Sequence, residues 1–261
     1  MAATKREREY ARKRQEKWEQ RQAQARARRQ RTFAIVAIVA VLALVGGGLV
    51  VANLGSTADP AASSAPQAAG DCPAVQPGAR SGGDLPDPSA AEDRTWAATL
   101  DLCTGAGESQ VTVELDGAAA PQAVASFVSL AQQGYFDDTA CHRLTTQGIF
   151  VLQCGDPTAT GTGDPGYSYG PIENAPKDDV YPAGTLAMAR QGGNGESMGS
   201  QFFIVYQDST IPSDTAGGYT VLGTVTSGLD AVQAVADAGV EGGAGDGSPA
   251  SPVIIEGVET Q

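Results

Sequence analysis

Three parts of the chain gather side chains that could do chemistry: residues 141–144 with 150–156, residues 186–190 with 199–204, and residues 219–223. Each part combines an arginine, a glutamine or an aromatic residue with apolar neighbours. A guanidinium beside an apolar cradle can donate a hydrogen bond that is strengthened because water is excluded. Each residue type also has a purely structural interpretation, as hydrophobic core or as an ordinary hydrogen-bonded amide, and spacing alone does not decide between the two.

His142 is the single histidine of the chain, and it stands directly before Arg143. Adjacent side chains of a strand point to opposite faces, so His142 would face away from the side on which Arg143 lies. We therefore interpret His142 as a structural, hydrogen-bonded residue rather than as an acid or base in catalysis.

The four cysteines, Cys72, Cys103, Cys141 and Cys154, are even in number and contain no C-x-x-C spacing. With one histidine in the chain they predict no zinc site, and in an oxidising compartment they predict two disulfides with three possible connectivities. We favour Cys141–Cys154, because these residues flank two strands expected to be antiparallel neighbours, together with Cys72–Cys103. A regular register would point the first two side chains to opposite faces, which leaves the other connectivities open.

Short strands and two helices must position these residues. Val111, Val113 and Leu115 alternate as in a half-buried strand, and strand-like runs follow at 150–154, 185–189, 202–205, 220–225 and 253–258. Pro121 opens a helix with apolar residues at helical spacing that stops at Gly134, and residues 229–238 predict a second helix. Many short strands with two helices predict a mainly β domain at residues 95–261, built as a closed antiparallel barrel.

The remainder of the chain differs sharply in charge. Between Lys5 and Arg31 lie twelve basic and four acidic residues, so the totals of 17 and 30 leave five basic against 26 acidic residues elsewhere. Residues 33–53 begin with twenty uncharged residues, enough for a helix of ~30 Å that crosses a bilayer. The basic residues 1–32 then stay cytoplasmic, and residues 54–94, rich in Ala, Ser, Pro and Gly, predict a flexible stalk outside.

Two features of this N-terminal part have a second interpretation. The apolar run could belong to a cleaved signal peptide, but a basic region of 31 residues is long for one, and we favour a retained anchor. The basic tail could bind nucleic acid or anionic lipid. The glutamate, glutamine and alanine residues among its charges favour a solvated segment that only fixes topology.

Taken together and in this order, the three parts resemble the signatures H-R-x…F-x-x-Q-x-G-D, L-x-M-A…G-S-Q-F-F-I and Y/H-x-V-x-G of the cyclophilin family. The resemblance covers residues 96–260 and includes the A-P-x-x-V-x-x-F helix at 120–127. It implies a closed eight-stranded barrel capped by two helices and peptidyl-prolyl cis-trans isomerase activity. The stalk, the apolar run and the form C-H-R-L-T-T…V-L-Q-C-G-D-P are most similar to membrane-anchored cyclophilins of Gram-positive bacteria.

The resemblance also implies roles for single residues. The family's catalytic arginine falls on Arg143, with Gln153 and Gln201 orienting the guanidinium and the peptide. The implied substrate-binding residues are Phe150, Val151, Ala189, Arg190, Phe203, Ile211 and Tyr219. Val151 stands where methionine is more usual in relatives. Arg190, Ile211 and Tyr219 depart from the asparagine, tryptophan and histidine common there, which puts tight cyclosporin binding in doubt.

The implied function is acceleration of X-Pro isomerisation in unfolded or extended proline-containing polypeptides, in particular exported proteins that fold outside the membrane. We expect no cofactor, a lipid bilayer as the partner of residues 33–53, and no nucleic acid. The implied location is the cell membrane, with a single span and the isomerase domain outside. The alternatives are a non-catalytic proline-peptide binding module or chaperone on the same fold, and a membrane tether in which the barrel is incidental.

Overall fold

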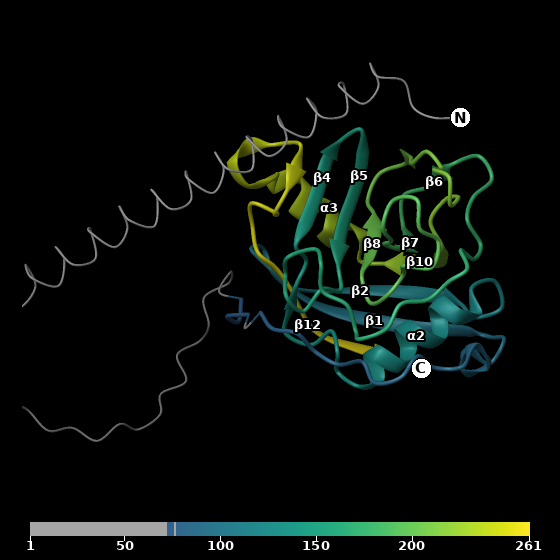
Figure 1. Cartoon of the computed structure of the whole chain (residues 1–261). Helices are drawn as coiled ribbons and strands as arrows, with labels where there is room; N and C mark the ends of the chain where they lie inside the picture. The colour runs from purple at the N-terminus through teal and green to yellow at the C-terminus, as the bar shows by residue number, and fades with distance from the viewer. Residues whose placement is uncertain (1–71, 76) are drawn as a thin grey trace, which may run out of the picture. The chain divides into compact units, whose positions relative to one another are not determined.

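The computed structural model describes residues 72–75 and 77–261, and these form a mainly β domain (Figure 1). Its helices are α2 (Pro121–Gln132) and α3 (Leu229–Ala238), with short 3-10 turns η1 (Pro88–Ala91) and η2 (Glu241–Gly243). Its strands are β1 (Thr95–Thr104), β2 (Gly107–Asp116), β3 (Thr139–Ala140), β4 (Arg143–Gln147), β5 (Ile149–Cys154), β6 (Val180–Tyr181), β7 (Thr185–Met188), β8 (Phe202–Val205), β9 (Ser209–Thr210), β10 (Val221–Ser227), β11 (Asp246–Gly247) and β12 (Val253–Thr260).

Ten strands form one antiparallel sheet in the order β11-β4-β5-β8-β7-β10-β2-β1-β12-β3, and β6 pairs with β9. Among the described residues this sheet has two ends, so the mainly β class with two helices is confirmed but the closed barrel of eight strands is not. The strand number is higher because Cys141 and His142 separate β3 from β4, and because β11 adds a two-residue strand beside β4.

The central strands are buried on both faces, so one face builds the main core and the other faces a smaller cluster. In β8 all four residues are buried; Phe202 and Ile204 join the main core, whereas Phe203 and Val205 join the smaller cluster. This division follows the two-residue period of a strand. The candidate site described below lies over the smaller cluster.

Helix α2 buries the apolar stripe that the sequence predicts, including Val124 and Phe127, and it contacts β12 and β2 (Figure 1). Its N-cap residue, Ala120, has no side chain that can accept a hydrogen bond. The carboxylate of Glu173 takes over this function by accepting from the backbone N–H of Gln122 at 3.0 Å and of Ala123 at 2.9 Å. A distant loop thereby satisfies two N–H groups that the helix itself cannot.

The described part of the predicted stalk makes defined contacts with the domain. Arg80 donates to the backbone carbonyl oxygens of Tyr135 at 3.0 Å and Asp137 at 2.5 Å. Ala91 is fully buried, and its carbonyl oxygen accepts from the indole N–H of Trp96 at 2.9 Å. These contacts place residues 77–94 against the domain. The boundary between stalk and domain at residue 95 stays a prediction.

The cysteines form the two disulfides that the sequence analysis favours, Cys72–Cys103 and Cys141–Cys154. The objection from strand parity does not apply, because Cys141 precedes β4 rather than lying in its regular register. Its backbone N–H donates to the carbonyl oxygen of Val253 on β12 at 2.9 Å. The second disulfide therefore lies at the break between β3 and β4, directly beside the candidate site.

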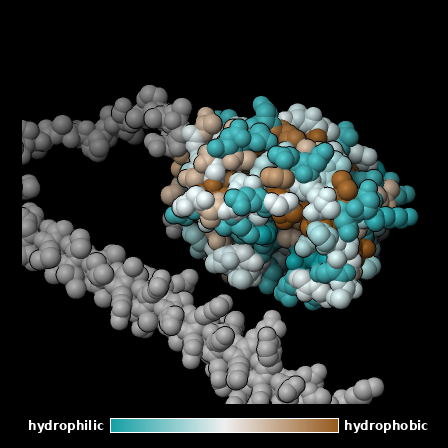
Figure 2. Space-filling view, turned by 90° about the horizontal axis from the view of Figure 1, so that it is seen from above, coloured by the Kyte–Doolittle hydropathy of each residue, from teal (hydrophilic) through white to brown (hydrophobic). Residues whose placement is uncertain are grey.

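In the described part of the chain no helix is both long and apolar enough to cross a bilayer. The predicted span at 33–53, the basic tail at 1–32 and the first part of the stalk lie outside the described residues. The face of the domain shown in Figure 2 is mostly polar, with hydrophobic residues in small separate patches. Among the described residues, the large hydrophobic side chains exposed to solvent are those of Leu85 and Val180.

Candidate active site

A pocket of about 170 Å³ opens over the smaller hydrophobic cluster. Strand β5 contributes every second residue to it, as a strand must when one face lines a cavity. The other walls come from β4, β8, the residues after β7 and the segment between β9 and β10. The lining residues are Arg143, Ile149, Val151, Gln153, Ala189, Arg190, Phe203, Ile211 and Tyr219.

The floor of the pocket is aromatic and aliphatic. The rings of Phe203 and Tyr219 meet edge to face with centroids 5.6 Å apart, and Phe203, Val151 and Ile211 are more than nine-tenths buried. A hydrogen bond fixes the backbone of Tyr219, because its N–H donates to the hydroxyl oxygen of Tyr181 at 2.7 Å. A rigid apolar floor of this kind fits a compact apolar ring.

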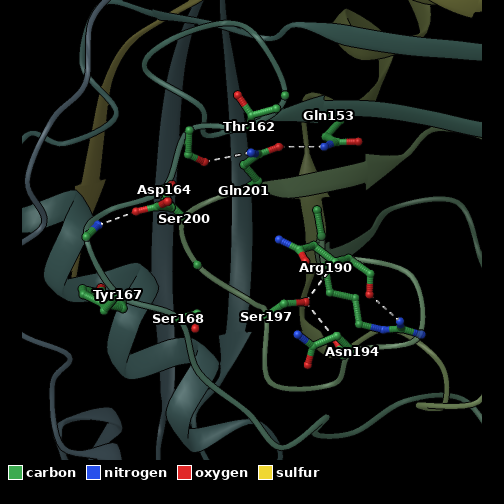
Figure 3. Close-up of a pocket in the computed structure, with 16 residues that line it drawn as sticks. Gln153, Thr162, Asp164, Tyr167, Ser168, Arg190, Asn194, Ser197, Ser200 and Gln201 are labelled. Carbon is green, nitrogen blue, oxygen red and sulfur yellow. Dashed lines mark hydrogen bonds between the residues drawn. The ribbon is translucent and has the colours of Figure 1, made fainter. Parts of the chain in front are cut away.

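Polar side chains form a directed chain along one edge of the pocket. Arg143 Nη1 donates to Gln153 Oε1 at 3.3 Å. Gln153 Nε2 then donates to Gln201 Oε1 at 2.9 Å, and Gln201 Nε2 to the carbonyl oxygen of Gly163 at 2.9 Å (Figure 3). An arginine can only donate and a carbonyl oxygen can only accept, so both amides between them have one possible orientation. The hydrogen bonds thus fix the orientation of both amides, while the orienting role of Gln153 and Gln201 in catalysis stays a prediction.

The far end of this chain is fixed by a buried carboxylate. Asp156 accepts from the backbone N–H groups of Thr158, Gly161 and Gly163 at 2.7, 2.7 and 3.1 Å. Burial alone would raise the pKa of the Asp156 carboxyl, but a hydrogen bond from the Thr158 hydroxyl at 2.7 Å and these backbone hydrogen bonds outweigh it and hold the pKa below its usual value. The loop carrying Gly163 is therefore ordered around this carboxylate.

Asp246 holds the guanidinium of Arg143 from the other side. Nε donates to Oδ1 at 2.7 Å and Nη2 to Oδ2 at 2.8 Å, so the ion pair is bidentate. The hydrogen bonds to Asp246 raise the pKa of Arg143, and the same bonds lower the pKa of Asp246. Nothing in the glycine-rich run around Asp246 signals this contact in the sequence, and only the pairing of β11 with β4 reveals it.

Arg190 forms part of the pocket wall, with a side chain that is 0% exposed. Its guanidinium pairs with Asp214 at 2.9 and 3.1 Å, donates to the carbonyl oxygens of Gly217, Gly218 and Gln191, and lies 4.6 Å from the ring centroid of Tyr219. The hydrogen bonds from Arg190 pull the pKa of the Asp214 carboxyl far below its usual value. This side chain has no free donor for a ligand and instead supports the loop that carries Tyr219.

Phe150 is not brought into the pocket. Its ring packs against the main core, with its centroid 6.0 Å from that of Tyr206. Ile149 lines the pocket in its place, on the same face of β5 as Val151 and Gln153. The two-residue alternation from Gln153 could have identified Ile149 in the sequence.

His142 does not line the apolar pocket and packs beside the loop of Gly161. It precedes β4 and lines a separate cavity of about 450 Å³ together with Arg143 and Asp246, so the predicted opposite orientation of the two side chains is not confirmed. Both ring nitrogens are buried and lack a hydrogen-bond partner among the described residues, so the expected hydrogen bonds of a structural histidine are not found. Burial lowers the pKa of His142, and Arg143 lowers it further while Asp156 opposes the shift. Burial therefore favours the neutral form of His142.

A second cavity of about 480 Å³ adjoins the pocket and shares Gln153, Ala189 and Arg190 with it (Figure 3). Its lining is mostly polar, and its carboxylate, Asp164, accepts from the backbone N–H of Gly166 at 2.8 Å. The combined site therefore offers an apolar pocket, a guanidinium at its edge and an adjoining polar cavity. Such a site can bind an extended peptide and donate a hydrogen bond to a group seated over the apolar floor.

Comparison with known proteins gives a family match over most of the domain. The family model described as cyclophilin type peptidyl-prolyl cis-trans isomerase/CLD matches residues 99–260. Two solved structures of a cyclophilin type peptidyl-prolyl cis-trans isomerase from Cryptosporidium parvum match with TM-scores of 0.51 and 0.50 at 25% and 26% identity. The matches cover 64% and 62% of this chain and 98% of each solved chain, and the second structure was determined in the presence of the dipeptide Ala-Pro.

Among curated proteins, the chain is 42% identical over 181 residues to the probable peptidyl-prolyl cis-trans isomerase B of Mycobacterium leprae, covering 65% of this chain and 59% of that protein. It is 49% identical over 150 residues to the protein of that name from Mycobacterium tuberculosis, covering 53% and 47%. The peptidyl-prolyl cis-trans isomerase B of Bacillus subtilis is 40% identical over 121 residues, covering 46% and 79%. The chain thus spans about half the length of the first two relatives.

Proposed function

The chain belongs to the cyclophilin-type peptidyl-prolyl cis-trans isomerase family, and on that basis we propose that it accelerates the cis-trans isomerisation of X-Pro bonds in polypeptides. The observation that carries the proposal is the position of Arg143. Its guanidinium stands at the edge of an apolar pocket sized for a small ring, and it is hydrogen-bonded to Gln153 and Asp246.

Cis-trans isomerisation of an X-Pro bond requires no covalent bond to be made or broken. An X-Pro bond resists rotation because amide resonance gives the C–N bond partial double-bond character, with a barrier of ~18–20 kcal/mol. In the twisted transition state the resonance is lost, and the proline nitrogen gains an available lone pair. A catalyst needs only to bind this twisted state more tightly than either planar isomer.

The residues of the site divide this work between them. Val151, Ile149 and Phe203 hold the prolyl ring, which places its nitrogen near the guanidinium. Arg143 donates a hydrogen bond to the nitrogen lone pair, and the apolar floor strengthens that bond by excluding water. Gln153 and Gln201 hold the donor in register, and the adjoining polar cavity takes a neighbouring residue of the peptide.

A protease-free isomerisation assay on the purified full chain tests the proposal. A short peptide with one X-Pro bond is transferred from a solvent that enriches the cis isomer, and its relaxation is followed optically. Uncatalysed relaxation takes tens to hundreds of seconds, so we expect catalytic amounts of the chain to shorten it in proportion to concentration. Relaxation at the uncatalysed rate, together with measurable peptide binding, would instead support a non-catalytic binding module.

We also propose a setting for this activity: a single-pass protein of the cell membrane, similar to membrane-anchored bacterial cyclophilins, with residues 33–53 in the bilayer and the isomerase domain outside. The basic excess before residue 33 supports this orientation. The two disulfides of the described domain support an oxidising compartment. The clients would then be exported polypeptides, and the Ala-Pro dipeptide in the solved relative agrees with a proline-containing ligand.

Protease added to intact, wall-stripped cells tests the orientation. We expect loss of the isomerase domain and survival of a small N-terminal fragment that contains residues 1–32. A domain that stays intact until the cells are lysed would reject the proposed orientation while leaving the isomerase proposal untouched.

A further inference from the structure

Asp246 lies 103 residues along the chain from Arg143, yet its carboxylate makes two of the hydrogen bonds that hold this guanidinium. The contact depends on β11, whose residues Asp246 and Gly247 pair with Thr145 and Leu144 of β4. Strand pairing therefore brings the carboxylate beside Arg143 by backbone hydrogen bonds, and the position does not depend on a flexible loop alone.

The hydrogen bonds leave a defined part of the guanidinium available. Of the five N–H groups of an arginine, Asp246 takes one on Nε and one on Nη2, and Gln153 takes one on Nη1. One N–H on each terminal nitrogen remains for a ligand. Because the two partners hold different edges of the planar group, they fix both its position and its plane.

We propose that Asp246 is a positioning residue for the isomerisation, and that it holds the Arg143 donor in its reactive orientation before the peptide binds. The inference rests on the proposed isomerase function. A long arginine side chain that is free to rotate would have to be ordered during the reaction itself. Ordering it in the folded protein removes that entropy loss from the catalysed step.

The negative charge of Asp246 also has an opposing effect, since it partly neutralises the guanidinium. The side chains are 40% and 55% exposed, so surrounding water screens this charge effect. The direction of an N–H bond is not screened in this way, and we therefore expect orientation to outweigh neutralisation.

Another ion pair of the domain gives a matched control. Arg94 and Glu92 also meet at 2.7 Å, with side chains 41% and 58% exposed, and neither residue lines the pocket. Exposed ion pairs contribute little to stability. Loss of either pair should therefore leave the fold intact, and only loss of the pair at Arg143 should change the kinetics.

The test compares the full chain with its Asp246→Asn, Asp246→Glu and Glu92→Gln variants in the isomerisation assay. Asn keeps the size of the side chain but removes the charge and one of the two acceptor oxygens. We expect Asp246→Asn to lower kcat on the order of tenfold with KM nearly unchanged. Asp246→Glu should recover part of the loss, and Glu92→Gln should match the wild type.

A double variant separates positioning from a purely structural effect. If Asp246 acts through Arg143, then Asp246→Asn should have almost no further effect in a chain that already carries Arg143→Ala. Nuclear magnetic resonance adds a readout without substrate: the Arg143 Nε–H should exchange slowly with water in the wild type and rapidly in Asp246→Asn.

An active wild type with full activity in Asp246→Asn would overturn the inference and leave the isomerase function standing. The same holds for a loss of equal size in the Arg143→Ala background, or for an Nε–H that exchanges equally slowly in both proteins. An inactive wild type would reject the isomerase function, and the inference would fall with it.

Discussion

Among the described residues, His142 is the ionisable side chain whose unperturbed pKa lies closest to neutral pH. Burial lowers its pKa in the folded chain below the unperturbed 6.5. Between these two values the unfolded chain binds a proton that the folded chain does not, so stability falls as the pH drops below about 6.5. The loss of stability due to His142 is complete once the pH has fallen below the pKa of His142 in the folded chain.

We therefore predict that His142→Asn changes the pH dependence of stability and not the chemistry. Urea unfolding from pH 7.5 to 5 should show a loss of stability in the wild type that is smaller in the variant. Isomerase activity per folded molecule should be kept, because the ring does not line the proline pocket. Parallel pH profiles of unfolding for both proteins would contradict the assigned pKa shift.

Phe203 and Phe150 provide a second prediction at this scale, since they face opposite sides of the sheet. Phe203→Leu removes part of the pocket floor and should lower kcat/KM on the order of tenfold, as expected for a change in an apolar pocket. Phe150→Leu should leave kcat/KM within about twofold of the wild type, because it alters only packing beside Tyr206. A larger kinetic effect of Phe150→Leu would show that Phe150 belongs to the substrate-binding site.

Among the elements, helix α2 depends on a residue outside itself for its N-terminal cap. Glu173→Ala removes two hydrogen bonds and a negative charge from the helix N-terminus. We predict a loss of ~0.5–2 kcal/mol in the free energy of unfolding, which is typical of lost caps. Glu173→Gln should give an intermediate loss, and Lys177→Ala on the same loop serves as an exposed control. Equal stability of Glu173→Ala and Lys177→Ala would show that the cap contributes nothing.

Elements with a clear period could be predicted from the sequence, and elements made by long-range pairing could not. The stripe around Val124 and Phe127 and the alternation around Val113 identified α2 and β2 directly. The two-residue strands β6, β9 and β11 have no period of their own, because each exists only through its partner strand. The site shows the same limit: Ile149 follows from alternation, but Asp246 comes into reach only through β11.

At the scale of the whole molecule, one disulfide connects the segment before the sheet to β1, and the other connects the break between β3 and β4 to β5. Cys72–Cys103 closes a loop with a sequence separation of 31 residues, and Cys141–Cys154 one of 13 residues. In the chain-entropy description, their removal should cost ~3.7 and ~2.9 kcal/mol of stability, respectively. Urea unfolding of paired Cys→Ser variants measures each loss. Peptide mapping without reductant should recover these two linked pairs, and four thiols that react with an alkylating reagent would contradict both.

The central claim concerns one donor in one pocket, and it is tested most directly by the kinetics of Arg143→Ala. A donor used only in the transition state should, when removed, lower kcat and kcat/KM together, on the order of 100- to 1,000-fold or about 2.7–4 kcal/mol. Arg143→Lys should recover little, because an ammonium lacks the fixed fork of donors. Circular dichroism must show that both variants are folded. Wild-type isomerase activity in a folded Arg143→Ala protein would contradict the account.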